Sequence, residues 1–186
     1  MSRTRTFAAL FLLLPLLTLG LGCYETQFPL GSADKASVDP AYVGDYVFTE
    51  DNKNSTITIR NIDNRLYYVE WLDSTDDKPN RMIGYTAAVN GAAFANLRGL
   101  TDDGSIDNKY LVMRIDLSPD RAHLTLRNLK DDFFKGKDVS SSAALEKTIG
   151  ENLDNPQMYD GDAVVAARVA APSATTTISL PATKSP

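Results

Sequence analysis

The chain has 186 residues, one cysteine, one histidine and a formal net charge of −5 at pH 7. This acidic balance argues against nucleic-acid binding, because phosphate recognition depends on clustered Lys and Arg side chains and the sequence has no basic stripe. One cysteine allows no internal disulfide, and a single histidine with a single cysteine cannot complete a zinc site. The sequence therefore predicts no metal ion and no cofactor.

The N-terminus has the pattern of an export signal. Arg3 and Arg5 give a positive start, the stretch 7–19 is apolar, and small residues follow it up to Gly22, directly before Cys23. A retained transmembrane helix is the weaker alternative, because the apolar run is shorter than the roughly 20 residues that a membrane span needs. We expect cleavage after Gly22, which leaves 17 basic and 24 acidic residues and a net charge of −7.

The position of Cys23 resembles the lipobox of bacterial lipoproteins, in which a leucine and two small residues precede an acceptor cysteine. Here Gly20 stands at the leucine position and Leu21 at a position that is usually smaller. The resemblance implies acyl chains such as palmitate on Cys23 and a firm lipid anchor in the cell envelope. Tyr24 implies sorting to the outer membrane, facing the periplasm, if the bacterium has two membranes. The alternative is ordinary signal peptidase, which would release a soluble protein with a free cysteine.

The mature chain divides into three parts by composition. Residues 24–40, which follow the lipidated Cys23, are polar and contain proline and glycine without apolar periodicity, so we expect a flexible tether. Residues 41–169 form one β-rich domain that is long enough to bury its own core. Residues 170–186 consist mostly of Ala, Pro, Ser and Thr, a composition that predicts a disordered tail.

Within the domain, eight segments alternate apolar and polar residues with a period of two, as half-buried strands do. Asn90-Gly91 is a strong signal for a type I′ hairpin, and Asp63-Asn64 is a second candidate. Ser118-Pro119-Asp120-Arg121 suits a type I turn. Connections this short require antiparallel pairing. The predicted strands are Val43–Phe48, Ser55–Arg60, Leu66–Leu72, Ile83–Val89, Ala92–Leu97, Lys109–Leu117, Ala122–Arg127 and Ala163–Val169.

One helix is predicted before the last strand. It begins near the serines 140–142 and runs to Leu153, with Leu145 and Ile149 on the same apolar stripe, and Asn155-Pro156 ends it. Eight strands and one amphipathic helix predict a mainly β fold, an antiparallel eight-stranded barrel-like or strongly curved sheet. A two-layer sandwich is the alternative.

Two further resemblances concern the domain. Gly44-Asp45-Tyr46 at the start of the first strand resembles the Gly-x-Trp triplet of lipocalins, which implies an eight-stranded barrel. From Cys23 to Tyr159 the chain resembles small bacterial lipoproteins of unknown function, through Phe28–Ser32 and Asn152–Pro156. This second resemblance implies no known activity.

The densest aromatic group is the candidate ligand site. Tyr68, Glu70 and Trp71 lie in one predicted strand, on which Tyr67, Val69 and Trp71 share one face and Tyr68 and Glu70 the other. If that second face lined a barrel, Glu70 would be a charged group in an aromatic pocket. The alternative places Tyr68 and Glu70 on a solvated face.

No residue group indicates catalysis. His123 alternates with apolar neighbours and is expected on the polar face of its strand. The aspartates of two loops lack the spacing of an EF-hand and are expected to be solvated; they are Asp73, Asp76, Asp77, Asp102, Asp103 and Asp107. Phosphate-binding glycine loops and a G-x-S-x-G motif are absent from the sequence. We therefore expect a protein that is not an enzyme.

Together these patterns predict a membrane-anchored bacterial lipoprotein of the cell envelope that works as a non-catalytic binding module. Its partners would be the membrane, through Cys23, and a small apolar ligand or an envelope protein. An envelope assembly or interaction protein with a filled core is the alternative. A hydrolase would require an acid pair in a cleft, which the sequence does not single out.

Overall fold

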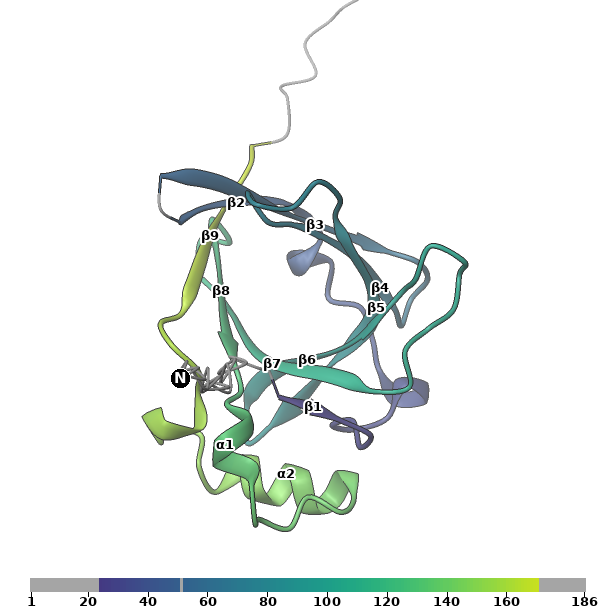
Figure 1. The fold of residues 1–186 in the computed structure, drawn as a ribbon, viewed down its shortest axis with the longest axis vertical. Coiled ribbons are helices and arrows are strands. Elements are labelled where there is room, and N and C mark those ends of the chain that lie inside the picture. Colours follow the sequence, from purple (N-terminus) through teal and green to yellow (C-terminus); the bar gives the residue numbers. More distant parts are fainter. Residues whose placement is uncertain (1–23, 51, 171–186) are drawn as a thin grey trace, which may run out of the picture.

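The computed structural model describes residues 24–50 and 52–170. Within them, nine strands form one antiparallel sheet, and β2 to β9 close into a barrel because β9 pairs with both β8 and β2. Figure 1 shows these eight strands as a ring. The predicted eight-stranded antiparallel barrel is confirmed. The strands are β1 (Glu25–Thr26), β2 (Gly44–Glu50), β3 (Lys53–Asn61), β4 (Tyr67–Leu72), β5 (Asn80–Val89), β6 (Ala92–Gly99), β7 (Tyr110–Leu117), β8 (His123–Asn128) and β9 (Val164–Arg168).

Side chains alternate between the barrel interior and its outer surface along each strand, and this alternation is why the predicted segments fold as strands. In β4, Tyr67 and Val69 are buried inside while Tyr68 and Glu70 face outward. Full burial of one large apolar side chain contributes about 1.5–3 kcal/mol. The interior contains Tyr46, Phe48, Ile57, Ile59, Tyr67, Val69, Met82, Ala95, Leu97, Met113, Ile115, Leu124, Leu126 and Ala166.

The turns agree with the sequence in two of three places. Asn90 and Gly91 have φ of 48° and 85°, the positive values that a type I′ turn requires. The turn at 118–121 also forms, since the amide of Arg121 donates to the carbonyl of Ser118 over 2.8 Å. Asp63-Asn64 does not form a two-residue hairpin turn. The Asp63 carboxylate instead accepts from the amides of residues 65 and 66, which makes a wider loop.

The predicted helix is α2 (Ser142–Gly150), and the Ser141 hydroxyl caps it by accepting from the amide of Ala144. A short helix that the sequence analysis missed, α1 (Asp131–Phe134), precedes it, and a 3₁₀ turn, η3 (Pro156–Met158), follows it. These elements form a second core against the outward-facing side chains of β5, β6 and β7. Its buried residues are Tyr24, Leu30, Val89, Phe94, Val112, Leu129, Phe134, Leu145, Ile149 and Met158.

The predicted flexible tether is wrong for residues 24–40, because this segment packs along the barrel. β1 pairs with the start of β7, and Tyr24 and Leu30 are buried. The amide of Leu30 donates to Oδ1 of Asn96 over 2.7 Å, and Nδ2 of Asn96 donates to the Leu30 carbonyl over 3.2 Å. The buried side chains of Tyr24 and Leu30 and the buried side-chain amide of Asn96 therefore hold this segment on the barrel, although its composition is mostly polar. The segment continues through two 3₁₀ turns, η1 (Ala33–Lys35) and η2 (Pro40–Tyr42).

Three expectations fall outside the described residues. They are the signal peptide, the lipid attachment at Cys23 and the C-terminal tail from residue 171 onward. In the described part of the chain, no helix is both long and apolar enough to cross a bilayer.

Candidate functional site

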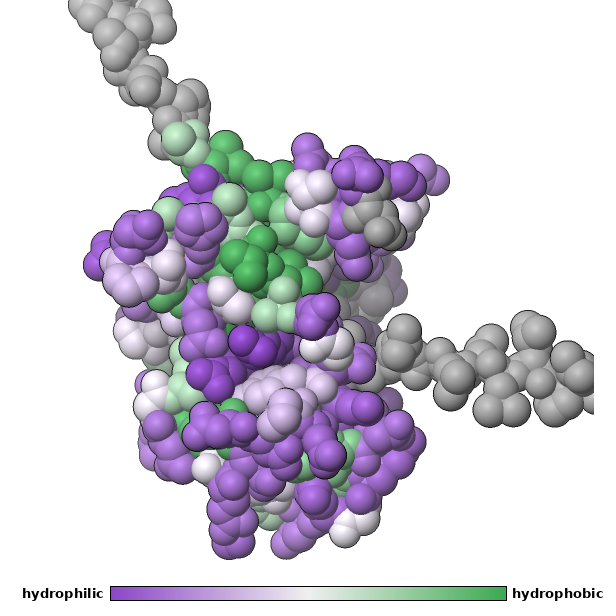
Figure 2. All heavy atoms as spheres, turned by 90° about the vertical axis from the view of Figure 1, so that its left-hand side faces the viewer, coloured by the Kyte–Doolittle hydropathy of each residue, from purple (hydrophilic) through white to green (hydrophobic). Residues whose placement is uncertain are grey.

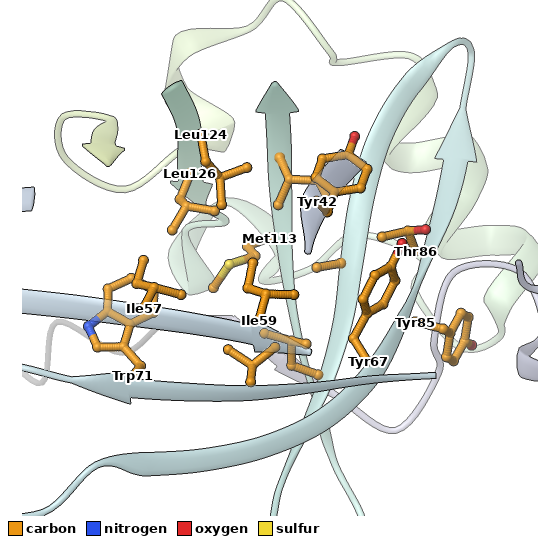
Figure 3. A pocket seen from close by; sticks show the side chains of 14 residues that line it. Tyr42, Ile57, Ile59, Tyr67, Trp71, Tyr85, Thr86, Met113, Leu124 and Leu126 are labelled. Carbon is orange, nitrogen blue, oxygen red and sulfur yellow. The ribbon is translucent and has the colours of Figure 1, made fainter. Parts of the chain in front are cut away.

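The candidate site is an apolar cavity inside the barrel. Figure 3 shows that it extends from Trp71 and Ile57 at one end to Tyr42, Tyr67 and Thr86 at the other. The space open to the centre of a water molecule is about 50 Å³, enough for a few water-sized groups. The lining residues are Tyr42, Ile57, Ile59, Tyr67, Val69, Trp71, Tyr85, Thr86, Ala95, Leu97, Met113, Ile115, Leu124 and Leu126.

The two ends of the barrel differ in what lies across them. Consecutive strands from β2 to β9 run antiparallel, so the C-terminal ends of β2, β4, β6 and β8 lie together. We call this end of the barrel the Trp71 end. The 3₁₀ turn η2, which we call the plug, directly precedes β2 and lies at the opposite end, which we call the plugged end. The rim of the Trp71 end includes Trp71 and Phe48, whose rings meet edge to face with centroids 5.6 Å apart.

Buried tyrosines fix the plug. The Tyr67 hydroxyl accepts from the amide of Asp39 over 2.6 Å, and the Tyr46 hydroxyl donates to the carbonyl of Tyr42 over 2.9 Å. Burial raises the pKa of both phenols, so both stay neutral and able to donate at physiological pH. Hydrogen bonds to the backbone and to Thr86 partly oppose this rise in the Tyr67 pKa. The hydroxyls of Tyr46 and Tyr67 are therefore used in hydrogen bonds to the backbone at the plug.

Arg168, the last residue of β9, ties the plug to the barrel. Its Nη1 donates to the carbonyl of Val43 over 2.6 Å and its Nε to the carbonyl of Arg121 over 2.9 Å. Its Nη2 donates to the carbonyl of Ala41 and to the hydroxyl of Tyr46. The guanidinium also lies over the Tyr46 ring, 4.7 Å from its centroid. One side chain thus joins η2, β2 and the turn between β7 and β8, and we call this set of contacts the Arg168 clamp.

The clamp gives a physical reason for the Gly44-Asp45-Tyr46 triplet. A Cβ on Gly44 would overlap Nη1 of Arg168, so any larger residue would require the guanidinium to shift from its position in the clamp. Tyr46 is fully buried and supplies both the ring and the hydroxyl that Arg168 contacts. Gly44 and Tyr46, two of the three residues that resemble the lipocalin triplet, therefore contribute to the Arg168 clamp at the plugged end.

The structure divides the predicted ligand-site group of Tyr68, Glu70 and Trp71. Trp71 lines the cavity, whereas Tyr68 and Glu70 lie on the outer surface of β4. There the Tyr68 hydroxyl donates to Glu70 over 2.7 Å, and Arg81 pairs with Glu70 over 3.3 Å. The prediction that all three line one pocket is wrong, because side chains on neighbouring strand positions point to opposite faces. The solvated-face alternative describes Tyr68 and Glu70.

The other polar candidates lie at the surface. His123 is exposed on β8. Asp103 accepts from the hydroxyl of Thr101 and from the amide and hydroxyl of Ser105 within its own loop. These hydrogen bonds lower the pKa of its carboxyl to about 2. Among the described residues, no three His, Cys, Asp or Glu side chains are placed to hold a metal ion.

Sequence reasoning missed two polar residues that build the site. Arg168 follows Val164 and Ala166 on the inward face of the last strand, so a charge on an apolar face was the available signal. Asn96 is fully buried on β6 between the apolar Ala95 and Leu97. Asn96 binds the backbone of Leu30, which lies in the segment that the sequence analysis treated as a flexible tether. Arg168 binds the carbonyls of Ala41 and Val43, directly after that segment.

A second surface feature is an apolar patch over β9 and β2. Figure 2 shows these side chains gathered on one side of an otherwise largely hydrophilic surface. Its most exposed members are Val165 and Val169, at 53% and 49%. A patch of this kind is typical of a contact surface for another molecule.

The comparisons with known proteins assign no relative. No family model matches the sequence, and neither the curated proteins nor the solved structures contain a significant match. The function is therefore proposed from the sequence patterns, the fold and the cavity.

Proposed function

We propose that this protein is a membrane-anchored, non-catalytic binding module of the bacterial cell envelope that holds a slender apolar ligand in its barrel. The observation that carries the proposal is the cavity, which is lined by apolar and aromatic side chains and has no charged residue in its wall. Such a lining favours hydrocarbon over a polar ligand, because a polar group without a hydrogen-bond partner is costly to bury.

The size of the cavity limits how much of a ligand it can enclose. Ligand pockets for drug-sized molecules measure roughly 300–1,000 Å³, well above the space of about 50 Å³ found here. Met113 lines the cavity, and its unbranched side chain can adopt other rotamers to lengthen the space. A single aliphatic chain fits this geometry better than a ring system.

Uptake of trans-parinaric acid, a straight fluorescent polyene of which the cavity would enclose one end, tests the ligand site. Ala95→Leu adds apolar volume to the cavity wall and is expected to weaken uptake at least tenfold, with little change in thermal stability because it fills space. The matched control is Tyr68→Ala on the outer surface of β4, which should bind as the wild type does.

Unchanged uptake by Ala95→Leu would contradict a site inside the barrel. Uptake lost in Tyr68→Ala but kept in Ala95→Leu would place the site on the outer surface. A native mass measurement of the wild-type protein adds an independent readout, since a retained ligand gives a defined extra mass that denaturation removes.

The anchor has its own test. We expect the mass of the membrane-extracted protein to begin at Cys23 and to include acyl chains, because the signal resembles a lipobox. Cys23→Ser should abolish the acyl mass and leave the protein unprocessed or soluble. An unmodified Cys23 terminus in the wild-type protein would refute lipidation.

An envelope interaction protein is the second candidate. The exposed apolar patch over β9 and β2 favours it, because a partner would cover Val165 and Val169. Crosslinking in intact cells should then recover one stoichiometric partner, and its absence together with ligand uptake would favour the first candidate.

A further inference from the structure

The start of the described chain lies at the same end of the barrel as Trp71. Trp71 is the second-last residue of β4, and Leu129 directly follows β8, which ends at the same end as β4. The amide of Tyr24 donates to the carbonyl of Leu129 over 3.1 Å. Tyr24 therefore lies at the Trp71 end, away from the plug.

Tyr24 is also firmly attached to the barrel. Its side chain is 4% exposed and stacks on Phe134 with centroids 4.1 Å apart. The next two residues pair with β7, Glu25 with Leu111 and Thr26 with Tyr110. Neighbouring Cα atoms are about 3.8 Å apart, so a membrane anchor attached to the residue before Tyr24 would pull on this end of the barrel.

We propose that the anchor holds the Trp71 end of the barrel against the bilayer, so that a lipid acyl chain enters the cavity directly from the membrane. This inference rests on the proposed function, since it needs both the acylated Cys23 and the apolar cavity. Because Tyr24 is fixed, acyl chains on its neighbour set the orientation of the whole barrel and not only its distance from the lipid.

The surface of the Trp71 end indicates which lipid it meets. Phe28, just after β1, is 37% exposed and adds an apolar side chain near Tyr24. The loops between β4 and β5 and between β6 and β7 carry the exposed Asp76, Asp77, Asp102 and Asp103. Asp102 pairs with Lys78 and Arg81 at 3.8 and 3.7 Å, but acidic residues still outnumber basic ones in these two loops. The excess negative charge repels anionic headgroups, so the partner surface is a zwitterionic phospholipid layer.

The only tryptophan of the chain allows a direct test. The acylated protein is placed in phosphatidylcholine vesicles that contain a lipid with a nitroxide on its headgroup, and quenching of Trp71 is measured. The control is the double variant Trp71→Phe with Asn64→Trp, which carries the same anchor but places the tryptophan in the exposed loop at the plugged end. We expect quenching of Trp71 to be at least twice that of the control.

A second variant separates orientation from anchoring. Six Gly and Ser residues inserted between Cys23 and Tyr24 add a flexible span of about 13 Å and should reduce the Trp71 quenching to the level of the control, while the protein still floats with the vesicles. Equal quenching in the two original proteins, or stronger quenching at position 64, would overturn the orientation. A protein without acyl mass overturns the anchor itself, whereas failed parinaric acid uptake with strong Trp71 quenching overturns only the ligand.

Discussion

Replacing Arg168 with alanine is expected to lower the free energy of unfolding by about 3 kcal/mol. The change removes donors to the carbonyls of Ala41, Val43 and Arg121 and to the hydroxyl of Tyr46. Each hydrogen bond to a charged group contributes about 1.5–3 kcal/mol, but bonds made by one side chain are not additive. Urea unfolding followed by Trp71 fluorescence gives the value.

The control for this prediction is Arg60→Ala. Nη2 of Arg60, on β3, donates to both carboxylate oxygens of Asp45 on β2, and both side chains are about half exposed. Its loss should cost no more than about 1 kcal/mol, because solvent screens exposed ion pairs. If the two variants lose the same stability, the Arg168 clamp does not hold the plug. Arg168→Lys should recover little, since one ammonium cannot reproduce the planar set of donors.

Asn96→Asp is expected to cost about 2–3 kcal/mol at neutral pH. A carboxylate at this fully buried position still accepts from the Leu30 amide, but it cannot donate to the Leu30 carbonyl and would carry an unpaired charge. Burial should raise the pKa of the new carboxyl above its unfolded value. The variant should therefore regain stability as the pH falls below that raised pKa, since the protonated acid can donate again.

Two measurements check this second prediction. Urea unfolding at pH 7 and pH 4 gives the stability difference, and amide exchange of Leu30 reports whether residues 24–43 detach from the barrel. The control is Asn54→Asp on exposed β3, where the amide accepts from Thr49, and it should change stability by less than about 0.5 kcal/mol. A pH-independent loss in Asn96→Asp would contradict the hydrogen-bond explanation.

The strands, the helix and most turns could be predicted because their signals are local. Alternation with a period of two appears wherever one face of a strand is buried, and Leu145 and Ile149 recur at the spacing of one helix face. The Asn90-Gly91 turn follows from the positive φ that these two residues tolerate. These features depend on residues within about ten positions of one another.

The candidate site was predicted less well, because its decisive contacts join distant residues. The alternation in β4 separates Trp71 from Tyr68 and Glu70, but only closure of the sheet decides which of the two faces becomes the interior. Leu30 and Asn96 lie 66 positions apart, and their pairing turns a segment of polar composition into part of the domain. Local propensity contains no information on such a contact.

The sequence by itself determined the strand order in the chain, the antiparallel pairing of close neighbours, the place of the helix and the expectation of an anchor at Cys23. Only the tertiary structure decided that β9 closes the barrel against β2, that Arg168 ties the plug across one end, and that Tyr24 is fixed on the outside of the barrel near the other end. The reason is physical. Secondary structure follows from short-range sterics and burial patterns, whereas closure, plug and orientation depend on which distant groups can satisfy one another once the chain is folded.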